Sequence, residues 1–248
     1  MLRTFGTAML CGLGLATSGL AQPVEDWIGR IDPQALQSGG IELDLHSGGE
    51  VDGFMRFGWY AEGDEVVLWD RTMWASQEIY ETYEARVARP DLAPQDVQIR
   101  FHQGPNYYRF EFGFEPGQAS GRVDIVRPGQ PEGGQELTAE LPEGSVLRAS
   151  VFMLAAILPL EVGEQIELDW FAPMNNAVSR VTLSAVERVT IETPNGPVDT
   201  IRLEQRGGEP PNDIFVDPAT RQVVRIDIGG QDMTFLVRPA PASETVAD

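Results

Sequence analysis

The run VLRASVFMLAAIL at residues 146–158 decides the fold. Ser145 precedes it and Pro159 follows it, so the sequence predicts a helix over 146–158 with Ser145 as N-cap and Pro159 as stop. The run is apolar on nearly every side, which is typical of a buried helix. It is too short to span a bilayer, so the rest of the chain must enclose it.

Most of the sequence on both sides of this helix predicts strands, because apolar and polar residues alternate in it. The clearest examples are Ile41–His46 and Phe110–Phe114. The other predicted strands are 51–60, 66–69, 97–101, 107–114, 123–126, 165–171, 179–186, 189–193, 198–205, 213–216, 223–228 and 233–237. The fold class expected is mainly β: a curved antiparallel sheet, a half-barrel or open barrel, wrapped around one buried apolar helix.

Three further segments complete the predicted organisation. Residues 23–36 carry apolar residues at helical spacing and predict a short amphipathic helix that acts as a lid. Residues 79–87 fit a helix or a strand, with their tyrosines favouring a strand. Residues 128–134, rich in Gly and Pro, predict a loop.

The first 21 residues predict a secretory signal peptide. Arg3 supplies the positive start, an apolar run follows, and Gly19-Leu20-Ala21 has small residues where signal peptidase needs them. We therefore expect export with cleavage after Ala21, a single β-rich domain over 22–238, and a disordered tail at 239–248. The one cysteine, Cys11, lies within the signal, so no disulfide is expected in the exported chain.

The charge balance excludes one class of partner. The chain has 18 arginines, no lysine and 38 acidic residues, for a net charge of -20. A chain this acidic is repelled by phosphate backbones and by anionic lipid headgroups, so we expect no binding to nucleic acid. No predicted helix is long enough to span a membrane.

The sequence offers little for catalysis. Only His46 and His102 supply imidazole, so no metal site and no cofactor are expected. Without lysine a P-loop is impossible, and no nucleophile elbow is present. A pair of catalytic carboxylates remains open, because acids are abundant and no pattern singles one pair out. We expect a protein that is not an enzyme.

Aromatic residues on alternating strand positions are the candidate binding residues. They fit an ordinary core, and they also fit the lining of a cavity for an apolar or sugar-like ligand. The residues predicted to line such a cavity are Trp59, Trp69, Phe110, Phe112, Phe114, Trp170 and Phe171.

Three stretches resemble a family of exported Gram-negative proteins that is known only as a domain of unknown function. They are LPLEVGE at 158–164, VTIETPNGPVDTIRL at 189–203 and FVDPATRQVVRI at 215–226, and Glu81–Glu84 and Leu92–Pro94 also fit. These motifs are turn and strand signatures without catalytic residues. In architecture the family is similar to the periplasmic lipoprotein carriers LolA and LolB, whose half-barrel holds acyl chains under a helical lid. No functional residue of the carriers can be placed on this sequence.

This resemblance implies a periplasmic location and a function. We expect a protein that binds a lipid, another hydrophobic ligand or a lipoprotein-like partner in the cell envelope. Two alternatives stay open: an envelope protein–protein interaction module, and a carboxylate-dependent glycan hydrolase.

Overall fold

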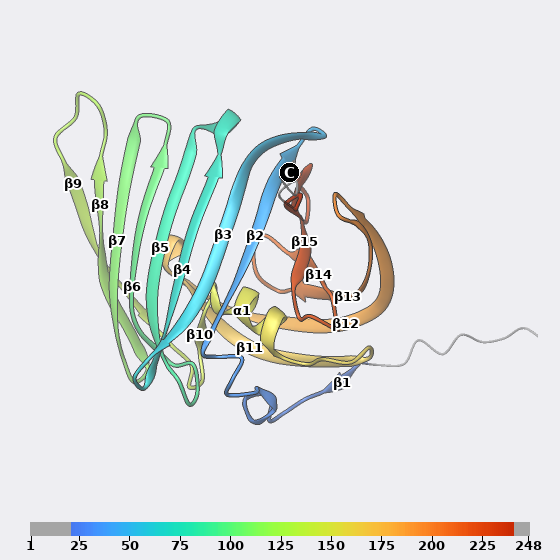
Figure 1. Ribbon diagram of the computed structural model, residues 1–248. Coiled ribbons are helices and arrows are strands. Elements are labelled where there is room, and N and C mark those ends of the chain that lie inside the picture. The colour runs from blue at the N-terminus through green and yellow to red at the C-terminus, as the bar shows by residue number, and fades with distance from the viewer. Residues whose placement is uncertain (1–20, 241–248) are drawn as a thin grey trace, which may run out of the picture.

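A computed structural model describes residues 21–240 as one strongly curved sheet (Figure 1). The sheet has 16 strands in the order β1-β11-β12-β13-β14-β15-β16-β2-β3-β4-β5-β6-β7-β8-β9, with β10 also on β11. Its two ends do not pair, so it is an open sheet rather than a closed barrel. The expected fold class is confirmed.

Two antiparallel meanders build the sheet. The first contains β2 (Ser38–Ser47), β3 (Glu50–Glu62), β4 (Glu65–Trp74), β5 (Ile79–Ala88), β6 (Pro94–Gln103), β7 (Asn106–Glu115), β8 (Gln118–Val126) and β9 (Gly133–Glu140). The second contains β11 (Glu164–Ala172), β12 (Ala177–Thr193), β13 (Gly196–Arg206), β14 (Asn212–Val216), β15 (Val223–Ile228) and β16 (Met233–Val237). They join where β16 pairs with β2, with Phe235 opposite Leu45.

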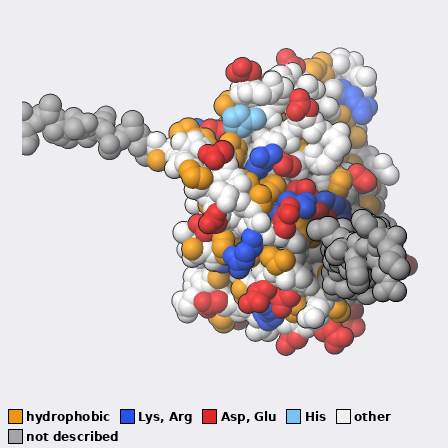
Figure 2. All heavy atoms as spheres, turned by 90° about the vertical axis from the view of Figure 1, so that its right-hand side faces the viewer, with side chains coloured by type: hydrophobic (Ala, Val, Ile, Leu, Met, Phe, Trp, Pro, Cys, Tyr) orange, Lys and Arg blue, Asp and Glu red, His pale blue; other side chains and the backbone are white. Residues whose placement is uncertain are grey.

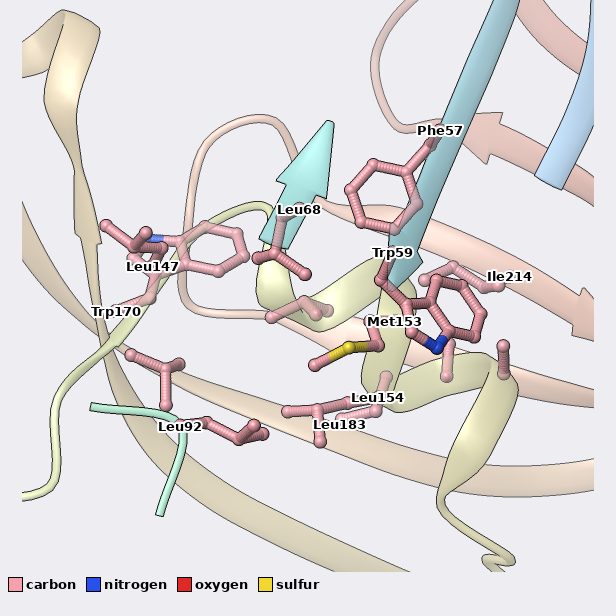
Figure 3. Close-up of a cluster of buried hydrophobic side chains, with 14 of the residues drawn as sticks. Phe57, Trp59, Leu68, Leu92, Leu147, Met153, Leu154, Trp170, Leu183 and Ile214 are labelled. Carbon is pink, nitrogen blue, oxygen red and sulfur yellow. The ribbon is translucent and has the colours of Figure 1, made fainter. Parts of the chain in front are cut away.

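The helix α1 (Ser150–Ile157) lies in the hollow of the sheet, as expected, among apolar side chains from both meanders (Figure 3). It is shorter than predicted. Val146–Leu147 instead form the short strand β10, parallel to Trp170 and Phe171 of β11. The edge of β11 satisfies the backbone groups of these residues, and the Ser145 hydroxyl donates to the carbonyl of Pro142 instead of capping the helix.

The predicted lid helix at 23–36 is wrong. This segment contains β1 (Gln22–Pro23), the 3-10 turn η1 (Ile28–Arg30) and further turns. Its apolar residues are nonetheless buried: Trp27, Ile31 and Leu36 join the core. The Trp59 indole donates to the carbonyl of Ala35 at 2.8 Å, which holds the segment in a turn conformation.

The structure also decides the predictions for residues 79–87 and 128–134. Residues 79–87 are a strand, within β5, as the tyrosines favoured. The predicted loop ends earlier than expected, because β9 begins at Gly133 and pairs with β8. Its side chains are largely exposed, so the alternation that marks a half-buried strand is weak there. Two short 3-10 turns, η2 (Ala75–Gln77) and η3 (Pro173–Asn175), complete the fold.

The surface carries both signs of charge. Figure 2 shows acidic and basic side chains interspersed on the face it presents, with hydrophobic side chains among them. Among residues 21–240, no helix has the length and apolar character needed to cross a membrane.

Candidate functional site

A pocket of about 270 Å³ opens on the inner face of the sheet, beside α1. Both meanders contribute to it, together with η3 and the start of the helix. Its apolar wall is formed by Met55, Phe57, Ile99, Ala149, Phe152, Ala172, Pro173, Met174, Pro210, Ile228, Met233 and Phe235. Its polar side chains are Asp70, Thr72, Glu81, Tyr83, Arg148 and Asn212.

Strand alternation places four of these polar groups side by side. Asp70 and Thr72 lie two residues apart on β4, and Glu81 and Tyr83 lie two apart on β5, so all four point to the inner face. The register sets Asp70 opposite Tyr83 and Thr72 opposite Glu81. The pocket therefore contains two carboxyl groups on neighbouring strands.

Burial changes the ionisation of these carboxyl groups. Burial, and secondly the negative charge of Glu81, raise the pKa of Asp70 to about 8. The Thr72 hydroxyl donates to Asp70 Oδ2 at 2.9 Å, which opposes this rise only in part. Burial also raises the pKa of Glu81, while the positive charge of Arg148 acts to lower it. At neutral pH Asp70 is therefore a proton donor.

Arg148 enters the pocket from the segment between β10 and α1. Its backbone N–H donates to the carbonyl of Phe171 at 2.9 Å, which fixes this segment against β11. Burial lowers the pKa of Arg148 from its usual range, with Glu81 acting the other way, although a guanidinium remains charged in proteins. The guanidinium lies 5.9 Å from the Trp170 ring centre and forms no ion pair with a described residue.

Two other pocket groups have unsatisfied hydrogen-bonding atoms. Tyr83 is only 5% exposed, and its hydroxyl has no hydrogen-bond partner among the described residues. The side-chain amide oxygen of Asn212 is likewise buried without a hydrogen-bond partner among the described residues. Buried polar groups in folded proteins nearly always have a partner, so these two atoms point to a bound molecule or water in the pocket.

The orphaned Tyr83 hydroxyl gives a stability prediction. Tyr83→Phe removes a buried group that has no partner while keeping the ring, so the ligand-free protein should gain about 1 kcal/mol in its free energy of unfolding. Urea denaturation measures this change. The matched control is Tyr60→Phe at an exposed position, which should stay within about 0.5 kcal/mol. A loss of stability in Tyr83→Phe would show that the hydroxyl does have a partner.

The histidines lie elsewhere. His46 is on β2 and His102 is on β6, where its ring lies 4.7 Å from that of Tyr107. Neither lines the pocket. Over residues 21–240, no three His, Cys, Asp or Glu side chains gather closely enough to hold a metal ion.

None of the seven predicted aromatic residues lines this pocket. Trp59, Phe110, Phe112, Trp170 and Phe171 are buried in the core, and Phe171 packs edge-on against Phe112 and Phe114. Trp69 alternates with Leu68 and Asp70, so it lies on the outer face, where its ring covers Gly58. A part for these seven residues in ligand binding stays a prediction.

The sequence did hold a signal for the pocket. Val66 and Leu68 are inner-face residues of β4, and the same alternation continues into Asp70 and Thr72. On β5 the inner-face positions are Ala85 and Tyr83, and the same alternation places Glu81 on the inner face. An acid at an inward position of each of two neighbouring strands departs from the usual apolar pattern.

Comparisons with known proteins give a family without a known activity. A family model described as "Protein of unknown function (DUF3108)" matches residues 68–236. No curated protein matches the chain. The solved structures similar to it include a β-barrel-like protein of the domain of unknown function DUF1849 from Brucella abortus. The identity is 10%, the match covers 82% of this chain and 97% of that one, and the TM-score is 0.47.

Proposed function

The chain belongs to the DUF3108 family of proteins of unknown function, and we propose that it binds a small amphipathic ligand in the pocket beside α1. The observation that carries this proposal is the pairing of an apolar wall with buried polar groups that have no partner. Ligand sites typically combine an apolar lining with a few convergent polar groups.

The polar groups define the head of the ligand. Arg148 offers a charged donor, protonated Asp70 a neutral donor, and the Tyr83 hydroxyl can donate or accept. A carboxylate or phosphate head would pair with Arg148, which is half-buried and forms no ion pair within 4 Å with a described side chain, although the charge of Glu81 acts on it. An unpaired buried charge is costly, so this pairing would favour binding.

The apolar wall defines the rest of the ligand. Phe57, Phe152 and Phe235 come from β3, α1 and β16, so the wall surrounds the ligand from three directions. A volume of about 270 Å³ is near the lower end for ligand pockets, so it suits a short chain or one end of a longer one.

The proposed setting is the cell envelope. Residues 1–21 lie almost wholly outside the described residues, and their sequence supports export with cleavage after Ala21. We therefore propose a periplasmic, non-enzymatic protein that holds a lipid-like molecule or the lipid-bearing end of a partner protein.

Native mass spectrometry tests this function. The exported form, residues 22–248, is purified from a Gram-negative periplasm without detergent. We expect an adduct that is lost on denaturation and identified as an amphipathic molecule. Arg148→Met removes the charged donor and keeps an apolar side chain, so the fold should survive and adduct occupancy should fall at least tenfold. Arg188→Met, at an exposed position, should keep the adduct. A clean mass from the unmodified protein would overturn the proposal.

A second candidate function rests on the two pocket carboxyl groups. Asp70 and Glu81 are diagonal neighbours on β4 and β5, which places their Cβ atoms roughly 7 Å apart. Glycoside hydrolases place a pair of carboxyl groups at the scissile bond, and the raised pKa of Asp70 suits the one that donates the proton. Turnover of envelope glycans that disappears in both Asp70→Asn and Glu81→Gln would establish this activity. Turnover that survives either change would exclude it.

A further inference from the structure

Beside the pocket, the inner face of the first meander carries a row of half-buried apolar side chains. The row consists of Phe101 on β6, Tyr108 on β7 and Ile125 on β8, which are successive register partners and therefore lie side by side. The ring centres of Phe101 and Tyr108 are 6.0 Å apart. These three residues are called the inner row below, and they are distinct from the residues that line the pocket.

The inner row begins at the wall of the pocket. Phe101 lies directly opposite the pocket residue Glu81 on β5, so the two side chains are on the same face of the sheet. Ile99 also lines the pocket, and it shares this face because it precedes Phe101 by two residues on the same strand. An apolar surface therefore continues from the pocket across β6, β7 and β8, which stand side by side in Figure 1.

The packing of the chain stops short of the inner row. At the next inward-facing positions of the same three strands, Ile99, Phe110 and Val123 are buried in the core. The inner row faces the same hollow, yet the described residues cover it only in part. Apolar side chains at inward-facing positions are ordinarily covered, so the inner row offers apolar surface to a bound molecule.

The inner row is one side chain wide. Toward the turn between β6 and β7, the next inward-facing positions are occupied by the polar residues Gln103 and Asn106. On its other side lies the buried row. The outer-face positions between the two rows carry the charged residues Arg100, Arg109 and Asp124, so the apolar strip belongs to the inner face. A strip of this width suits a single hydrocarbon chain that lies across the strands.

The volume of the pocket limits how much of a ligand it can hold. A cavity of about 150 Å³ holds benzene, so the pocket of about 270 Å³ holds roughly a dozen non-hydrogen atoms. An acyl chain of more than about ten carbons must therefore extend beyond the pocket. Past Ile125, the next register partner is Gly133 on the edge strand β9, where no side chain limits the length of such a chain.

We propose that the ligand is an anionic amphiphile with one long acyl chain, whose tail leaves the pocket over Ile99 and lies along the inner row toward β8. This inference rests on the proposed function, because the pocket must hold the charged head beside Arg148. From β5 to β8 the tail crosses roughly 14 Å at the usual strand spacing. It covers three half-buried side chains, and removing their apolar surface from water favours binding. A ligand with two acyl chains would leave one of them without a matching strip.

The affinities of saturated fatty acids of increasing length test this arrangement. Octanoate, dodecanoate and hexadecanoate, each below its micelle concentration, are titrated into the exported form freed of bound lipid, and binding is measured by calorimetry. Octanoate fits within the pocket. Each methylene added beyond it should raise the affinity about twofold, which corresponds to half of the free energy of full burial. An affinity that rises no further after octanoate would overturn the proposal.

Substitutions in the inner row locate the tail. Phe101→Ser combined with Ile125→Ser should weaken hexadecanoate binding at least tenfold and change octanoate binding by less than about twofold. Ile125→Leu should bind both acids like the unmodified protein. The matched control is Ile79→Ser on β5, which removes a half-buried inward-facing side chain beside the pocket but outside the inner row, and it should leave both affinities unchanged. Circular dichroism verifies that each variant is folded.

The head and the tail can fail separately. Arg148→Met should weaken all three acids by the same factor, because each carries the same carboxylate. If octanoate binds and hexadecanoate binds no more tightly, this inference is wrong and the proposed function stands. If none of the acids binds, this inference is wrong, and the native mass spectrum decides the proposed function by itself. Hexadecanoate binding that is weakened by Ile79→Ser but not by the inner-row variant would place the tail toward β4, which also contradicts the proposal.

Discussion

Arg221→Met is expected to lower the free energy of unfolding by about 3–5 kcal/mol. Arg221 lies in the turn between β14 and β15, yet its guanidinium caps the helix. Nε donates to the carbonyl of Ala156 at 2.9 Å, and Nη2 donates to the carbonyls of Ala155 and Leu158. The last carbonyls of a helix have no partner within it, so methionine would leave those of Ala155 and Ala156 without a donor, while that of Leu158 would keep only the Leu160 N–H.

Urea denaturation followed by tryptophan fluorescence measures this loss. Arg221→Lys should recover part of it, because an ammonium group can reach some of the carbonyls but cannot copy the guanidinium fork. Arg188→Met is the matched control, and at its exposed position it should change stability by less than about 0.5 kcal/mol. A small effect of Arg221→Met would mean that water replaces the cap.

Stability is expected to fall as pH rises from about 4 to about 8, mainly through Asp70. Its pKa is about 8 in the folded protein against an ordinary value of 3.8. Below pH 4 both states are protonated and Asp70 has no effect. Above that, the unfolded chain releases its proton first, so rising pH favours unfolding. With allowance for solvent in the pocket, the total change should be on the order of 4 kcal/mol.

Asp70→Asn should remove most of this pH dependence and make the variant more stable than the unmodified protein at pH 8. Glu81, whose pKa is also raised, would account for the remaining slope. The control is Asp124→Asn on the outer face, where Arg109 and Arg122 hold the pKa of the carboxyl below its usual range. That change removes ion pairs that are fully formed above about pH 5, so it should lower stability by a similar amount from about pH 5 to pH 8, leave the slope there unchanged, and lose its effect in acid, where the unmodified carboxyl is protonated too. An unchanged slope in Asp70→Asn would place the titrating group elsewhere.

Much of the fold could be predicted because it depends on local patterns. Alternation gave nearly all strands, and the apolar run at 146–158 gave the buried helix. The errors involve partners distant in the chain. Val146 and Leu147 form a strand only because the edge of β11 is available to them, and residues 23–36 stay in turns partly through the distant Trp59 indole.

The pocket could not be predicted for a related reason. Each of its acids could be recognised as an inward polar residue on one strand, but their neighbourhood depends on the register of β4 against β5. Arg148 lies within the predicted helix, where a charged residue looks like an interruption of an apolar run. Only the folded chain brings it to the same pocket as Asp70 and Glu81.

The pairing of β16 with β2 determines when folding can finish. Partners such as Leu45 and Phe235 lie about 190 residues apart, so closing this contact carries a large entropic cost and comes late. The hairpins of the first meander are local and can form early. Until Met233–Val237 joins them, the edges of β2 and β15 remain open to strands of other molecules. A chain truncated before β16 should therefore aggregate or exchange strands between copies.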